Sequence, residues 1–168
     1  MNIRENIINE FLEEQDWTTE QIIFLAGDAS NRKYFRVKNN NGRAILMDAP
    51  PNKEDVRPFI FFTNYLLELG YSVPNIFGEN AKEGLLLLED FGDNTFTQVL
   101  LQGIKESEIY ECAIDLLIDL HKQPVIENRK DRIGSYGHQK LYREISLFVE
   151  WYMPVSYTHL TLPTILLV

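Results

Sequence analysis

The residues best suited to chemistry form a short loop near the start of the chain. Residues 27–31 (Gly-Asp-Ala-Ser-Asn) are small or polar, and three cations follow at Arg32, Lys33 and Arg36. Small residues let backbone N–H groups approach an anion closely, and adjacent cations neutralise its charge. The segment therefore predicts a phosphate-binding loop, and the alternative is an ordinary surface β-turn.

Strands are expected on both sides of this loop. Residues 22–25, 33–37 and 43–47 are rich in β-forming residues, and Asn-Gly precedes the last of them. Asn-Gly between two such runs is a strong hairpin signal. Because alternate residues of a strand face opposite sides, only one of Arg32 and Lys33 can face a phosphate, and we favour Arg32.

The chain then passes from strands to helices. A helical apolar face opens the chain at residues 3–12, and an amphipathic segment at 54–69 ends at Gly70. Two more strands and three helices are expected, near residues 73–77 and 84–89 and near residues 96–101, 107–121 and 139–152. Strands followed by helices predict an α+β fold.

Composition narrows the class of protein. A net charge of −9 argues against a nucleic-acid partner, which would favour a basic face. No apolar run is long enough to cross a membrane and the start lacks a signal-peptide pattern, so we expect a cytoplasmic protein. The single cysteine, Cys112, excludes an internal disulfide, and its helical spacing with Ile109 and Leu116 predicts a buried core thiol. His121 has no partner at metal-ligand spacing, and catalysis is assigned to none of the three histidines.

Four blocks occur in one order and spacing: Gly27-Asp-Ala-Ser30, Tyr34-Phe-Arg36, Leu46-Met-Asp-Ala-Pro-Pro51 and Leu86-Leu-Leu-Glu-Asp-Phe-Gly-Asp93. Together they resemble the N-terminal part of the aminoglycoside-phosphotransferase family, and within it the branch of bacterial anomeric kinases of N-acetylmuramate and N-acetylglucosamine. The resemblance runs from about residue 16 to residue 154. It implies a kinase-like lobe at 1–92, an antiparallel sheet of about five strands plus a helix, and then the first helices of a second, truncated lobe at 93–154.

The resemblance also implies a nucleotide site for ATP. The loop would lie over the triphosphate, Ile45 and Leu88 would wall the base, and Met47 stands on the third strand. Asp93 is expected to reach the ribose or, with Asn94, to cap the next turn. The full set of implied nucleotide-binding residues is Gly27, Asp28, Ala29, Ser30, Asn31, Arg32, Ile45, Met47, Leu88, Glu89, Asp90, Phe91 and Asp93.

Asp90-Phe-Gly92 spells the magnesium-binding tripeptide of protein kinases, but its position favours another role. In those kinases the tripeptide follows a catalytic loop, and no such loop precedes it here. It follows the fifth predicted strand instead. The resemblance implies that Glu89 to Phe91 form the hinge between the lobes, whose backbone groups bind the adenine edge.

One feature departs from kinases in general, which hold the α- and β-phosphates with a lysine on the third strand and pair it with a helix glutamate. Met47 or a neighbour occupies that position and no lysine is present. We expect Arg32, Lys33 or Arg36 to substitute for it. Glu54 and Asp55 are expected to cap the following helix rather than to pair with a cation.

Catalytic residues are not assigned. No residue between Asp93 and Pro154 matches the family's catalytic aspartate loop or its later metal-binding aspartate, so Mg²⁺ is expected only in the full-length parent. Residues 155–168 resemble a translated sequencing adapter and are expected not to be native. The hypothesis is therefore the ATP-binding part of a small-molecule phosphotransferase acting on a sugar hydroxyl, itself inactive. The alternatives are a non-catalytic nucleotide-binding module and an α+β interaction domain.

Overall fold

A computed structural model describes residues 3–17, 21–27, 30–39, 42–126 and 129–156. The chain divides into two compact units, residues 1–121 and 122–168. The sheet and the candidate site lie in the first unit.

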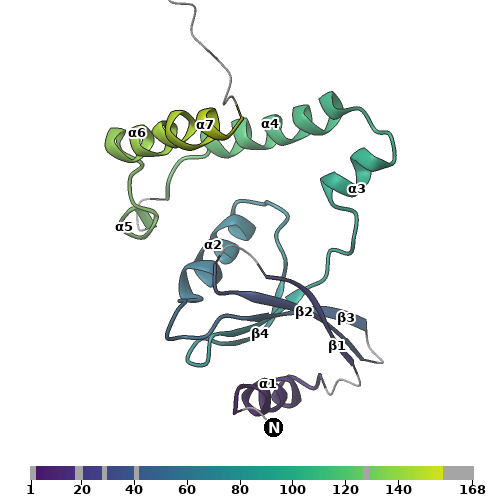
Figure 1. Cartoon of the computed structure of the whole chain (residues 1–168). Coiled ribbons are helices and arrows are strands. Elements are labelled where there is room, and N and C mark those ends of the chain that lie inside the picture. Colours follow the sequence, from purple (N-terminus) through teal and green to yellow (C-terminus); the bar gives the residue numbers. More distant parts are fainter. Residues whose placement is uncertain (1–2, 18–20, 28–29, 40–41, 127–128, 157–168) are drawn as a thin grey trace, which may run out of the picture. The chain divides into compact units, whose positions relative to one another are not determined.

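The first unit is built on one antiparallel sheet (Figure 1). Its five strands lie in the order β1-β2-β3-β5-β4. Their bounds are β1 Gln21–Gly27, β2 Lys33–Asn39, β3 Gly42–Asp48, β4 Ile76–Asn80 and β5 Leu85–Glu89. The five strands and the α+β class expected from the sequence are thus confirmed. The fourth strand begins three residues later than predicted because residues 73–75 approach it without strand pairing.

The expected helices are also present. In the first unit they are α1 Ile3–Glu14, α2 Arg57–Glu68, α3 Phe96–Leu101 and α4 Glu106–Lys122, the last ending one residue beyond the unit. The second unit contains α5 Lys130–Ile133, α6 His138–Leu147, a π-helical turn at Phe148–Tyr152 and α7 Met153–Ser156. Residues 157–168 lie outside the described residues, so the non-native origin of the last segment stays a prediction.

Two helices cover opposite faces of the sheet (Figure 1). Leu46, Leu85 and Leu87 pack with Phe11 and Leu12 of α1. On the other face, the core contains Met47, Leu86, Leu88 and Val56, with Phe59 and Ile60 of α2 packed against it. Because successive side chains of a strand alternate between faces, the apolar run of β5 is divided between the two helices.

A partly buried ion pair fastens α1 to β3. The Arg4 guanidinium donates to Asp48 Oδ1 from Nε at 2.9 Å and from Nη2 at 2.6 Å. Asp48 is one of the two polar residues among the buried residues described, so its carboxylate depends on this partner. The pair fixes the register of α1 along the sheet.

The expectation of a buried Cys112 is wrong, because this thiol is exposed on α4. Its helical neighbour Leu116 is also exposed, and Ile109 is the buried residue of that helix. Periodicity identifies an apolar face of a helix but does not say whether anything covers it. Among the described residues, no helix has the length and hydropathy needed to cross a membrane.

Gly84 provides a test of the turn that precedes β5. It has φ +67°, and a Cβ there would collide with the carbonyl oxygen of Ala49, whose N–H donates to the Gly84 carbonyl oxygen at 2.9 Å. We expect Gly84→Ala to lower the free energy of unfolding by about 3 kcal/mol or more, because backbone must move. Urea unfolding followed by circular dichroism measures this.

Gly70→Ala is the matched control. Gly70 has φ +86°, but no atom lies within 4 Å of the position that a Cβ would take, so only the cost of the left-handed conformation applies, about 1 kcal/mol. Equal destabilisation by the two substitutions would show that the contact with Ala49 contributes nothing.

Candidate functional site

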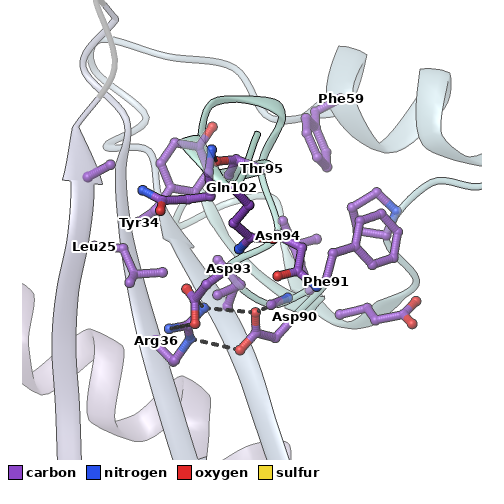
Figure 2. A pocket seen from close by; sticks show the side chains of 17 residues that line it. Leu25, Tyr34, Arg36, Phe59, Asp90, Phe91, Asp93, Asn94, Thr95 and Gln102 are labelled. Atoms are coloured by element: carbon purple, nitrogen blue, oxygen red, sulfur yellow. Dashed lines mark hydrogen bonds and ion pairs between the residues drawn. The ribbon is translucent and has the colours of Figure 1, made fainter. Parts of the chain in front are cut away.

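A cavity of about 770 Å³ opens on the α2 face of the sheet. Apolar side chains form its walls, chiefly Leu25, Ile45, Phe59 and Leu88. Polar residues of the segment after β5, residues 90–94, which we call the linker, form its edge together with the start of α3. Figure 2 shows the labelled side chains around this space. The arrangement suits a flat, mostly apolar ligand with a polar rim.

Strand register brings the central part of this wall together. Arg36 pairs with Ile45 across β2 and β3, and Ile45 pairs with Leu88 across β3 and β5. Directly opposed residues face the same side of a sheet, so these three side chains form one row. On β1, a register irregularity between Phe24 and Ala26 lets both Leu25 and Ala26 line the cavity.

Arg36 joins β2 to the linker (Figure 2). Its Nε and Nη2 atoms donate to the two carboxylate oxygens of Asp90 at 2.8 and 3.1 Å, and Nη2 also donates to Asp93 Oδ1 at 2.8 Å. The Asp90 side chain is only 3% exposed, whereas that of Asp93 is 71% exposed. The Gly92 N–H donates to Asp90 Oδ1 at 2.8 Å, so Asp90 holds both the arginine and the linker backbone.

The charge state of Asp90 follows from these contacts. Burial raises the pKa of the Asp90 carboxyl, but the hydrogen bonds from Arg36 and from the Gly92 N–H lower it further, and the net pKa lies below its ordinary value of 3.8. The pKa of Arg36 is raised by its hydrogen bonds to Asp93 and Asp90. The pair is therefore fully ionised at neutral pH.

The predicted phosphate loop lies at the other end of β2. Gly27 ends β1, and Asp28 and Ala29 lie outside the described residues. Ser30 Oγ accepts from the Arg32 N–H at 3.3 Å, and Asn31 N–H donates to Glu54 Oε1 at 3.0 Å. Of the described loop residues, Gly27 and residues 30–32 do not line the large cavity, although Ala26 and Tyr34 beside them do.

The role predicted for Glu54 is wrong. Instead of capping α2, which begins at Arg57, its carboxylate lies 3.4 Å from the Arg32 Nε and accepts from the loop backbone. Asp55 accepts from the Arg57 N–H at 3.0 Å and so does take the helix-start role. Pairs between distant elements of this kind carry no periodic signal in the sequence.

The three candidate cations occupy three different places. Arg32 lies beside Glu54, and Arg36 lies beside the linker. Lys33 lines a smaller cavity of about 360 Å³ on the α1 face with Arg4 and Asp48. Lys33 thus faces α1, whereas Arg32, which precedes β2, contacts Tyr34 and Glu54 and does not line that cavity. Met47, at the position of the missing lysine, is fully buried in the core under α2.

Several residues of the site were not anticipated. Tyr34, Phe59, Thr95, Gln98 and Gln102 line the cavity, and Tyr34 and Phe59 belong to segments that the sequence placed correctly. The helix cap expected from Asp93 and Asn94 is instead supplied by Thr95, whose Oγ1 accepts from the Gln98 N–H. Within the described part of the chain, no three His, Cys, Asp or Glu residues are grouped so as to hold a metal ion.

Comparisons with known proteins agree on one family. The phosphotransferase enzyme family profile matches residues 21–151. N-acetylmuramate/N-acetylglucosamine kinases are similar to this chain: that of Pseudomonas aeruginosa is 37% identical over 133 residues, 79% of this chain and 38% of the relative. That of Neisseria meningitidis is 32% identical over 136 residues, 79% of this chain and 39% of the relative. The chain thus spans about two fifths of the length of these relatives.

The Arg36–Asp90 pair predicts a pH-dependent effect on stability. We expect Asp90→Asn to lower the free energy of unfolding by about 2 kcal/mol at pH 7, because the Arg36 charge loses its buried partner. Since the folded pKa of Asp90 is depressed, this stabilisation is present above its ordinary pKa of 3.8 and is lost as pH falls through the lower folded value. Denaturant unfolding of both proteins between pH 7 and pH 3 measures the difference.

Asp93→Asn is the control for this prediction. The Asp93 carboxylate contacts the same guanidinium but is mostly exposed, so we expect a loss of at most about 1 kcal/mol. A difference between wild type and Asp90→Asn that stays constant from pH 7 to pH 3 would contradict the ionic origin of the effect.

Proposed function

The chain belongs to the phosphotransferase enzyme family, and from this premise we propose that the whole protein transfers the γ-phosphate of ATP to a hydroxyl group of an amino sugar. This chain supplies the nucleotide-binding part. Both statements rest on the family match over residues 21–151 and on the names of the similar kinases. Use of ATP also supports a cytoplasmic location.

The observation that carries the proposal is the cavity between the sheet and the linker. Its wall at Ile45 and Leu88 offers apolar surface to one face of an adenine ring, and the linker offers polar backbone at the edge. The Glu89 N–H already donates to the Asn75 carbonyl oxygen at 2.9 Å. The adenine edge is therefore bound by the Glu89 carbonyl and by the backbone of Phe91, rather than by every peptide group of the hinge.

The ribose position follows from the same edge. Asp93 is the exposed member of the Arg36 cluster, and a carboxylate has about four lone-pair sites, so it can accept from a ribose hydroxyl while keeping Arg36. Met47 is excluded from direct contact with the nucleotide by its burial in the core. It lies beside Ile45 and Leu88 on the same face of the sheet and packs in the core there.

Transfer itself needs groups that we assign to the rest of the whole protein. Phosphoryl transfer uses an aspartate that orients the acceptor hydroxyl and carboxylate or amide ligands for Mg²⁺, which neutralises charge on the phosphates. No residue from Asp93 to Pro154 matches those motifs. We therefore propose that this polypeptide binds ATP without turning it over. The proposed acceptor is an amino sugar, by analogy with the names of the relatives, and the proposed setting is cell-wall recycling.

Nucleotide binding is tested by thermal unfolding of the 168-residue chain. ATP at 100 times its dissociation constant stabilises a protein by about 2.7 kcal/mol, which corresponds to a rise in Tm of about 5–10 °C for a chain of this size. The measurement is differential scanning fluorimetry with increasing ATP. An unchanged Tm up to millimolar ATP would favour the interaction-domain alternative.

Transfer is tested separately with γ-labelled ATP and either N-acetylmuramate or N-acetylglucosamine. We expect no labelled sugar from the 168-residue chain and labelled sugar from the full-length Pseudomonas aeruginosa kinase run as a positive control. Labelled sugar formed by the purified chain would overturn the proposal that it lacks turnover.

A further inference from the structure

Met47 occupies the β3 position where kinases in general carry a phosphate-binding lysine, and its neighbour on β2, Tyr34, contacts a cation. Met47 pairs with Tyr34 across β3 and β2, so the Tyr34 side chain faces the side of the sheet to which a third-strand lysine would point. Tyr34 lines the large cavity. A cation held next to Tyr34 would therefore stand near the place where kinases in general put their phosphate-binding lysine.

Arg32 is that cation. Its guanidinium interacts with the side chains of Tyr34 and Glu54. The Arg32 side chain is 30% exposed and that of Glu54 is 15% exposed. Burial lowers the pKa of Arg32, but Tyr34 and the Glu54 charge raise it to a net value above the ordinary one. The guanidinium is thus a permanent positive charge beside Tyr34, which lines the cavity.

Glu54 is held in place by contacts other than the one with Arg32. Its N–H donates to the Pro50 carbonyl oxygen at 3.0 Å, within the turn that ends β3. One carboxylate oxygen then accepts from the Asn31 N–H and the other faces Arg32 Nε. A guanidinium presents five donors in a rigid fork, so contact of Nε with Glu54 orients the remaining donors. The same carboxylate therefore orders both the end of the loop and the cation.

The other two cations are placed less well for a triphosphate. Arg36 lies four residues further along the chain, about 13 Å away at the rise of an extended strand, and is held between two carboxylates at the linker end of the cavity. Lys33 lines the cavity on the opposite face of the sheet. In the described part of the chain, Arg32 is the candidate cation that contacts Tyr34 on the cavity side of the sheet and also adjoins the predicted phosphate loop.

We propose that Arg32 contacts the triphosphate of the bound nucleotide and that Glu54 is its positioning residue, so that this pair replaces the lysine–glutamate pair of other kinases. This inference deepens the proposed nucleotide-binding function and rests on it. Arg32 directly precedes β2 and Glu54 lies in the turn after β3, so neither comes from the third strand or a helix. The Arg32–Glu54 pair therefore requires no cation on β3, where Met47 packs in the core instead.

The test compares ATP with adenosine, which has the base and ribose but no phosphate. Isothermal titration of the 168-residue chain gives both affinities. We expect Arg32→Gln to weaken ATP binding about tenfold or more, because a charge-assisted hydrogen bond is lost, and to leave adenosine binding unchanged. Lys33→Gln makes the same change of charge one residue away on the opposite face and is expected to leave both affinities unchanged.

Glu54→Gln separates positioning from charge. Glutamine keeps an oxygen that can accept from the Asn31 N–H but removes the negative charge beside Arg32. We expect ATP binding to weaken about threefold or more with adenosine binding unchanged, since the arginine fork is no longer held. If Glu54 merely competed with phosphate for Arg32, the substitution would strengthen ATP binding, and that result would overturn its positioning role.

The remaining outcomes are distinct. Equal loss of ATP and adenosine affinity in Arg32→Gln, or equal loss of ATP affinity in Lys33→Gln, would refute the phosphate contact. Thermal unfolding of each variant identifies a loss caused by misfolding, and Arg32→Lys, which keeps the charge, must then retain more ATP affinity than Arg32→Gln.

Wild-type chain that binds neither ATP nor adenosine would refute the proposed function itself. Binding of both, with ATP affinity unaffected by Arg32→Gln, would refute this inference alone.

Discussion

The two central strands, β3 and β5, must bury both of their faces, and the rest of the first unit follows from this constraint. Leu85 to Leu88 are all buried, and alternation sends two of them toward α1 and two toward α2. Neither helix alone can cover both faces of the sheet. Coverage of the second face by α2 is incomplete at the Ile45–Leu88 pair, and the candidate cavity lies there. The site is thus the part of an apolar sheet face that α2 does not cover, which explains why its walls are apolar and its edge is polar.

Features with a local signal were predictable from the sequence. The apolar run of residues 85–88 predicts a central strand because only a strand buried on both faces tolerates it, and β5 is central. That physics acts within a few residues, so one sequence contains it. The cavity-lining residues Ile45, Leu88, Glu89, Phe91 and Asp93 were instead supplied by the family resemblance, and all five do line the cavity.

Features that depend on contacts between distant segments were not predictable. Arg36 and Asp90 are 54 residues apart, and Asn31 and Glu54 are 23 apart. Nothing in the pattern of either partner specifies the other. Glu54 was assigned to the helix start because acidic residues there interact well with the helix dipole, but the turn at Pro50 places it under the loop instead. Cys112 shows the same limit, since its periodicity is that of a buried face and its exposure depends on what packs against α4.

The two arginine clusters differ in a way that matches different tasks. Arg36 and Asp90 are largely buried and bidentate, and burying such a pair costs desolvation energy that replacement by apolar residues would avoid. Its retention is best explained by geometry, because it ties β2 to the linker and so fixes the two sides of the cavity relative to one another. The Arg32–Glu54 contact is longer, at 3.4 Å, and more exposed. A guanidinium that is oriented but not saturated by its carboxylate can still meet a second anion, whereas one enclosed by two carboxylates gains little from a third. Arg36 therefore holds the two sides of the cavity together, and a separate residue directly before the same strand, Arg32, is the cation proposed to bind the ligand.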